Sequence, residues 1–178
     1  MHYNSEGEEY YRYLDSLTMG KKSKSKVKAS KQHRTYLYTY TGGQSKPSIS
    51  QAAAHIRFSP SIEFIPPEAF IDRHLLQDVE LNDGLQWIDH KAFMGCTSLT
   101  HIRIPSAVIA ISSSAFEDCS SLREVELTEG LQFIMDRAFQ GCTSLRRIII
   151  PSTVKKIDSQ VFQNCRNLEH VELREGLE

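Results

Sequence analysis

The sequence of 178 residues predicts an α/β solenoid, in which short strands form a parallel β-sheet and short helical turns connect them, preceded by a disordered basic arm. Two observations predict this class. Apolar residues recur at a fixed step of 23 residues from residue 55 onward, and the lysines are concentrated before that region. Self-similarity at a period of roughly 20–50 residues is typical of chains that stack one structural unit on the next.

Charge divides the chain into an arm and a body. Residues 1–54 contain nine Lys and Arg against four Asp and Glu, whereas residues 55–178 contain twelve against eighteen. We expect three regions: a disordered basic arm over 1–34, a capping strand with a linker over 35–54, and the solenoid over 55–178. The solenoid holds five units and the beginning of a sixth, so we expect it to be truncated, with further repeats beyond the given sequence.

The centre of the arm is a run of lysines separated by small residues. These are Lys21, Lys22, Lys24, Lys26, Lys28 and Lys31. Repelling charges with almost no apolar side chains cannot offset the entropy of ordering, so the run should be disordered. Two interpretations stay open: a targeting or polyanion-binding patch, and a solvated tail without a receptor.

The segment that follows the arm alternates tyrosine with other residues and ends at a pair of glycines. Tyr36, Tyr38 and Tyr40 share one side at the period of a strand. We therefore expect a strand over Thr35–Thr41 that covers the first edge of the solenoid.

Eight columns of small or apolar residues keep the 23-residue step. The most regular are the phenylalanines Phe70, Phe93, Phe116, Phe139 and Phe162 and the cysteines Cys96, Cys119, Cys142 and Cys165. One unit can bury these side chains only against another unit, and each large buried side chain contributes roughly 1.5–3 kcal/mol. Stacking of units is therefore obligatory.

Local patterning orders the elements within each unit. Val79–Leu81 and Ile102–Ile104 alternate apolar and polar residues and predict strands with one buried face. The corner after the strand uses glycine, which accepts positive φ, or proline, which fixes φ: Gly84, Gly130, Gly176, Pro105 and Pro151. A short helical turn should then end at the phenylalanine. The second residue after each phenylalanine is Asp, Gly or Asn, the types that best tolerate the left-handed conformation.

The repeated phrase Ala-Phe-x-x-Cys-x-x-Leu, followed by a strand and a Pro-Ser or Glu-Gly corner, resembles the BspA-type leucine-rich repeat over about residues 54–178. The resemblance implies a leucine-rich-repeat solenoid with a parallel sheet, no cofactor, no catalytic residues and roles in protein binding. It also implies that some bacterial relatives act as surface adhesins. The first unit departs from the pattern because Arg73 stands in the cysteine column, which suits an end unit partly open to solvent.

The cysteines are expected to be free thiols. They lie in one column, so stacked neighbours point the same way, and the sequence carries no export signal that would favour disulfides. Four sulfurs in a line cannot surround a metal ion, and no base accompanies them. With no phosphate loop and no carboxylate pair in a cleft, we expect no enzymatic activity, no cofactor and no small-molecule substrate.

Membrane insertion is not expected either. A spanning helix needs about 18 or more consecutive apolar residues, which no window approaches, and Met1–Gly20 lacks the apolar segment of a signal peptide. We therefore expect an intracellular chain, cytoplasmic or nuclear.

The polar strand positions predict an outward face on which charge alternates from strand to strand. In order, they are His55 and Arg57, Asp78 and Glu80, His101 and Arg103, Glu124 and Glu126, Arg147 and Ile149, and His170 and Glu172. Arg57 should pair with Glu80, Glu80 with Arg103, and Arg103 with Glu126, each pair worth up to ~1 kcal/mol. The mixture leaves no continuous basic stripe for a phosphate backbone, so nucleic acid is not expected on the solenoid, and the basic arm is the one place where its binding stays an alternative.

Ile149 stands where the equivalent residues are charged. Together with Arg123, Arg146 and Arg147 it forms a basic and apolar spot typical of a protein-binding surface. The alternative is an incidental exposed isoleucine.

His101 and Arg103 belong to the same face and complete the candidate site. His101 and His55 also flank Asp78, where a shared carboxylate is favoured over a metal site because ligands so exposed lack supporting groups.

The favoured function is a non-catalytic scaffold that binds an unidentified protein, with the basic arm as a tether. One alternative is a localisation or nucleic-acid-associated protein that acts through the arm. Another is a surface adhesion protein whose export signal is missing from this sequence. The uncapped strand Val171–Leu173 further predicts self-association, unless additional repeats cover it.

Overall fold

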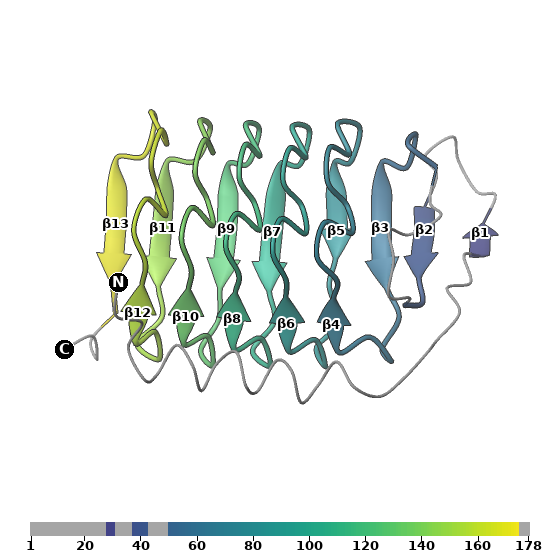
Figure 1. The fold of residues 1–178 in the computed structure, drawn as a ribbon, viewed down its shortest axis with the longest axis horizontal. Coiled ribbons are helices and arrows are strands. Elements are labelled where there is room, and N and C mark those ends of the chain that lie inside the picture. Colours follow the sequence, from purple (N-terminus) through teal and green to yellow (C-terminus); the bar gives the residue numbers. More distant parts are fainter. Residues whose placement is uncertain (1–27, 31–36, 43–49, 175–178) are drawn as a thin grey trace, which may run out of the picture.

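The computed structural model describes residues 28–30, 37–42 and 50–174. From residue 55 these form a solenoid in which each 23-residue coil contributes a longer strand to one side and a two-residue strand to another (Figure 1). The predicted parallel β-sheet solenoid is confirmed. The longer strands, here called the long-strand row, are β2 (Leu37–Tyr40), β3 (His55–Phe58), β5 (Asp78–Glu80), β7 (His101–Ile104), β9 (Glu124–Leu127), β11 (Arg147–Ile150) and β13 (His170–Leu173).

The two-residue strands form one continuous parallel sheet, here called the short-strand sheet. Its members are β4 (Phe64–Ile65), β6 (Trp87–Ile88), β8 (Ala110–Ile111), β10 (Phe133–Ile134) and β12 (Lys156–Ile157). Neighbouring strands pair in register at a step of one coil.

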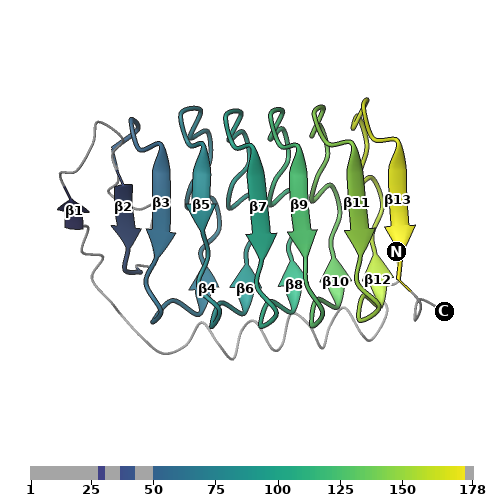
Figure 2. The ribbon, with the colours of Figure 1, turned by 180° about the vertical axis from the view of Figure 1, so that it is seen from behind.

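Pairing within the long-strand row is interrupted at regular intervals. Continuous ladders join β2, β3 and β5, then β7 and β9, then β11 and β13. Strand β7 lies beside β5, and β11 beside β9, without a ladder between them (Figure 2). The ladders of the long-strand row therefore join the coils in couples, while the short-strand sheet links all of them.

The predicted helical turns are absent from the described residues. The segment before each phenylalanine has turns instead, since the residue two positions before it also has positive φ: Glu68, Lys91, Ser114, Arg137 and Gln160. Two left-handed residues four positions apart prevent a helical hydrogen-bond pattern. The backbone N–H groups instead bond to the next coil, as Phe93 does to the carbonyl of Ala115 at 2.8 Å.

Positive φ two residues after each phenylalanine is confirmed in all five coils. The angles are 56° at Asp72, 72° at Gly95, 57° at Asp118, 72° at Gly141 and 61° at Asn164. The Asp, Gly and Asn residues, which tolerate this conformation, therefore predicted the position of each turn correctly.

The corner glycines differ from the prediction. Gly130 has φ of 113°, as expected, but Gly84 has no positive φ. The side chain of Asn82 shapes that corner instead: it donates to the carbonyl of Ser59 at 3.0 Å and accepts from the Gly84 N–H at 2.9 Å. Gly176 lies outside the described residues.

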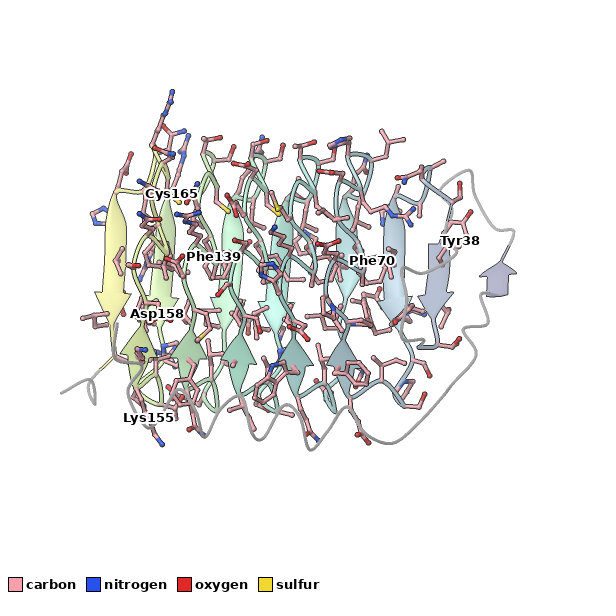
Figure 3. All side chains as sticks on the ribbon, in the orientation of Figure 1. Tyr38, Phe70, Phe139, Lys155, Asp158 and Cys165 are labelled. Atoms are coloured by element: carbon pink, nitrogen blue, oxygen red, sulfur yellow. The ribbon has the colours of Figure 1, made fainter. Side chains whose placement is uncertain are left out.

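The phenylalanine column is the centre of the core. Phe70, Phe93, Phe116 and Phe139 are fully buried, and Figure 3 shows Phe70 and Phe139 inside the coils. Successive rings stack nearly parallel, with centroids 5.1, 5.3 and 5.4 Å apart, and Phe162 continues the stack at 6.1 Å. Aromatic contacts of this kind add about 0.5–1.5 kcal/mol each to the burial of area.

The cysteine column consists of free, buried thiols. Each Sγ–H donates to the carbonyl of the phenylalanine one coil earlier, at 3.1–3.3 Å. Burial raises the pKa of Cys96 to about 12 and raises the pKa of Cys119, Cys142 and Cys165 as well. Thiolate, the reactive form, is therefore scarce at neutral pH.

These thiols are expected to resist alkylation by iodoacetamide in the folded protein at pH 8. Cys165, in the last coil, is the least buried of the four and should react first, while Cys119 should react only on unfolding. Mass spectrometry of peptides after timed labelling, with and without denaturant, measures the order. Early labelling of Cys119 would contradict the buried column.

The first edge of the solenoid is closed by β2, which pairs in parallel with β3. Tyr40 is buried, and its ring packs edge-on against Phe58 and Phe70 at 5.1 and 5.4 Å. Because β2 extends the row, the first coil is not an open end. Arg73, in the turn between β4 and β5, is 6% exposed rather than open to solvent, and burial lowers its pKa.

Three residues of the expected disordered arm have regular structure. Lys28–Ser30 form β1, which pairs antiparallel with β2. The expectation of disorder is wrong for these three residues, because they add to the edge strand. Lys21, Lys22, Lys24, Lys26 and Lys31 lie outside the described residues.

The part of the chain that the structure describes contains no helix with the length and apolar character needed to cross a bilayer.

Candidate protein-binding surface

The outward side of the long-strand row carries the charged residues that alternation predicts. In β7 and β9, outward residues are exposed while their neighbours are buried, because successive strand residues point to opposite faces. Register places His101 beside Glu124 and Arg103 beside Glu126. The same register places Arg57 beside Glu80 and Arg147 beside His170.

Each couple of coils holds an ion pair across its ladder. Arg57 donates to Glu80, with Nη2 3.1 Å from Oε1, Arg103 Nε lies 3.3 Å from Glu126 Oε1, and Arg147 Nη2 lies 2.5 Å from Glu172 Oε2. Hydrogen bonding to Arg57 lowers the pKa of the Glu80 carboxyl. All six side chains are about half exposed, so each pair stabilises the fold only slightly.

One expected pair is replaced by another. Glu80 does not bond Arg103 among the described ion pairs; Arg103 Nη1 lies 3.6 Å from Asp83, in the turn after β5. The reason is the missing ladder between β5 and β7, which leaves these two strands without fixed cross-strand pairing.

The two histidines share a carboxylate as favoured by the sequence. Asp78 lies 3.5 Å from His55 Nδ1 and 3.1 Å from His101 Nε2. Among the described residues, no group of three or more His, Cys, Asp and Glu side chains is placed to hold a metal ion.

The remaining candidate residues lie around β9 and β11. Arg123 and Arg146 are exposed and directly precede these strands, one coil apart, and Arg147 begins β11. Ile149 is half-buried and faces Glu172 across the ladder. The structure thus places the arginines and the isoleucine within two neighbouring coils, at β9 and β11, while His101 and Arg103 lie on β7.

Arg123 and Arg146 differ from the other arginines of this face. No carboxylate of the described residues pairs with either guanidinium, whereas Arg57, Arg103 and Arg147 each have a carboxylate partner. Their charge is therefore uncompensated. Both arginines precede their strands, outside the alternating positions, so the pairing pattern does not extend to them.

Two exposed apolar features were missed at the sequence level. Leu75 is 56% exposed in the turn before β5, and Phe64 is 45% exposed on the short-strand sheet. Phe64 belongs to a column with Trp87, Ala110, Phe133 and Lys156 at the usual step. The signal in the sequence is the column of residues that directly precede the isoleucines Ile65, Ile88, Ile111, Ile134 and Ile157.

The fold and its repeated coils define a leucine-rich repeat solenoid. The model of the family described as BspA type leucine-rich repeat region matches residues 50–178 with six copies. The chain belongs to this family. A comparison with curated proteins gives no match.

Solved structures with the same fold include the T. pallidum leucine-rich repeat protein, at 22% identity and a TM-score of 0.65, covering 85% of this chain and 82% of that chain. The pneumococcal vaccine antigen PcpA matches at 20% identity and 0.65, covering 85% and 49%. A leucine-rich cell surface protein from Faecalibacterium prausnitzii matches at 20% and 0.55, covering 89% and 56%. The present chain spans about half of the last two. At these identities the likeness shows the fold alone.

Proposed function

We propose that the chain is a non-catalytic protein-binding scaffold whose binding surface is the outward side of the long-strand row around β9 and β11. The observation that carries this proposal is the pair of exposed guanidinium groups on Arg123 and Arg146, without carboxylate partners among the described residues, in the two neighbouring coils of which the second also holds the half-buried Ile149. Arginine and apolar side chains together are typical of the centre of protein interfaces.

The surface favours a partner that presents carboxylates beside an apolar side chain. The partner's carboxylates would pair with Arg123 and Arg146 in the forked geometry that guanidinium groups offer. Its apolar side chain would pack on Ile149. His101 and Arg103 lie further along the face and would extend the contact.

Ile149→Arg is expected to weaken partner binding by about tenfold or more, as loss of a central apolar contact does. The variant should keep its melting temperature, because arginine follows the alternation and faces Glu172. The measurement compares proteins captured from extract by the native chain and by the variant, followed by titration of the captured protein.

Gln77→Glu is the matched control, since Gln77 is exposed and occupies the position of Arg123 and Arg146 in an earlier coil. A captured protein that is lost with Arg146→Glu and Ile149→Arg but retained with Gln77→Glu supports this surface. Equal binding by all variants contradicts it.

The second candidate is adhesion at a cell surface. It is supported by the description of the F. prausnitzii structure as a cell surface protein.

The third candidate function is polyanion binding by the arm, through Lys21–Lys31. Replacing its six lysines with serine in the same capture experiment should leave the protein partner bound if the arm is only a tether, and should abolish salt-sensitive binding if the arm is the binding element.

A further inference from the structure

The long-strand row is interrupted at two places, which we call the first seam, between β5 and β7, and the second seam, between β9 and β11. At each seam the two strands lie side by side without a ladder (Figure 2). The short-strand sheet passes both places unbroken, because β6 pairs with β8 and β10 pairs with β12. Two coils that meet at a seam are therefore joined by a ladder in the short-strand sheet and not in the long-strand row.

Backbone hydrogen bonds at the start of the long strands mark the same two places. Within a couple, the Arg123 N–H donates to the Thr100 carbonyl at 2.9 Å, and the Glu169 N–H donates to the Arg146 carbonyl at 3.0 Å. At the first seam the corresponding bond, from the Thr100 N–H to the Gln77 carbonyl, measures 3.4 Å. At the second seam, none of the described backbone hydrogen bonds joins Arg146 to the Arg123 carbonyl. The second seam is therefore held less firmly than the first.

Side chains bridge the strands of the first seam only. Asp78 of β5 lies 3.1 Å from His101 Nε2, and Asp83, in the turn after β5, lies 3.6 Å from Arg103 Nη1. Among the described ion pairs, none joins β9 to β11, because these strands form their pairs within their own couples.

The second seam is closed at both ends. Before the strands, the Ser144 N–H donates to the Ser120 carbonyl at 3.2 Å. After the strands, Glu129 accepts hydrogen bonds from Ser152 Oγ at 3.0 Å and from the Thr153 N–H at 3.3 Å. Separation of the two coils on this side is therefore confined to β9 and β11.

We propose that β9 and β11 separate locally at the second seam while the short-strand sheet keeps their coils together. Local opening occurs where few interactions hold a segment, and no ladder and no described ion pair joins these two strands. Arg123 directly precedes β9 and Arg146 directly precedes β11. Opening therefore changes the spacing of the two arginines and lets the outward face meet carboxylates of different separation. The opening itself does not rest on the proposed protein-binding role.

Alternate amides of β11 face the seam and the ladder. In a parallel strand, successive N–H groups point to the two neighbouring strands in turn. The N–H of His170, which begins β13, bonds to the previous coil. Arg147 begins β11 in the same way, so the N–H groups of Arg147 and Ile149 face the second seam. Those of Ile148 and Ile150 face the ladder to β13.

Amide hydrogen exchange of the full chain, resolved by NMR and corrected for intrinsic rates, tests the proposal. The N–H groups of Arg147 and Ile149 should exchange about tenfold or more faster than those of Ile148 and Ile150. Strand β3 is the matched control, because it has a ladder on each side and its alternate amides should show no such difference. Equal protection of all four amides of β11 would overturn the proposal.

Asp78→Asn with Asp83→Asn tests why the first seam is held more firmly. The double variant weakens both side-chain contacts across that seam. The Arg103 N–H, which faces β5, should then exchange several-fold faster, while the Ile149 N–H should exchange as in the native chain. An unchanged rate at Arg103 would contradict the ranking of the two seams by their side-chain bridges.

Discussion

Phe116→Ala is expected to lower the free energy of unfolding by about 3–5 kcal/mol, the usual loss for a buried phenylalanine. Phe116 is fully buried, and its ring stacks on Phe93 and Phe139 at 5.3 and 5.4 Å. Alanine leaves a cavity between two rings that the backbone hydrogen bonds between coils hold apart. Urea denaturation followed by circular dichroism measures the change.

Phe162→Ala is the matched control for this substitution. Phe162 ends the described stack, is only partly buried and has one ring neighbour, at 6.1 Å. Phe162→Ala should lower the free energy of unfolding by roughly half as much as Phe116→Ala, because the transfer and cavity contributions both fall when a side chain is more exposed. Equal losses at both positions would contradict a stack whose stability comes from neighbours on both sides.

Gly130→Ala is expected to destabilise the protein by about 1–3 kcal/mol or more, the range for a residue held in a sparsely populated backbone conformation. Gly130 has φ of 113°, and an added Cβ would lie 2.1 Å from the carbonyl oxygen of Ser106. Because the Ser106 oxygen belongs to the backbone, no side-chain rotation can move it away, and the two coils would have to separate.

Gly84→Ala tests whether position or conformation matters. Gly84 occupies the same corner two coils earlier, has no positive φ, and would place a Cβ 3.3 Å from the Asn82 side chain and 3.7 Å from backbone. We expect Gly84→Ala to lower the free energy of unfolding by much less than Gly130→Ala does. Thermal unfolding measures the destabilisation of both variants. Similar destabilisation at the two positions would show that the corner excludes a side chain whatever the φ of its glycine.

Much of the fold follows from the period alone. The buried columns, the parallel pairing at one coil and the left-handed residues after each phenylalanine all follow from residue types that each have one physical role. The left-handed residues before each phenylalanine could not be predicted, because Glu68, Lys91 and Arg137 are not types that favour positive φ. Hydrogen bonds to the next coil impose their conformation, and a pattern confined to one coil does not contain them.

The sequence predicted which residues lie on the outward side of the long-strand row, but not all of the ion pairs that they form. Alternation placed Arg57, Glu80 and Arg103 on the outward side, and the Arg57–Glu80 pair forms as expected. Arg103 bonds Asp83 instead of Glu80, because the ladder stops between β5 and β7. The residue spacing is the same at every coil and therefore does not reveal where the ladder stops. The protein-binding role of Ile149 and its arginines stays a prediction.

The couples of coils constrain how such a molecule can change in length during evolution. Deleting one coil, for instance the one that holds β5, would bring Arg57 next to Arg103 on adjacent strands, and like charges directly opposite destabilise a sheet. Deleting or duplicating two coils together would keep every basic strand beside an acidic one. Relatives that arose by internal duplication of this array should therefore differ from it by even numbers of coils.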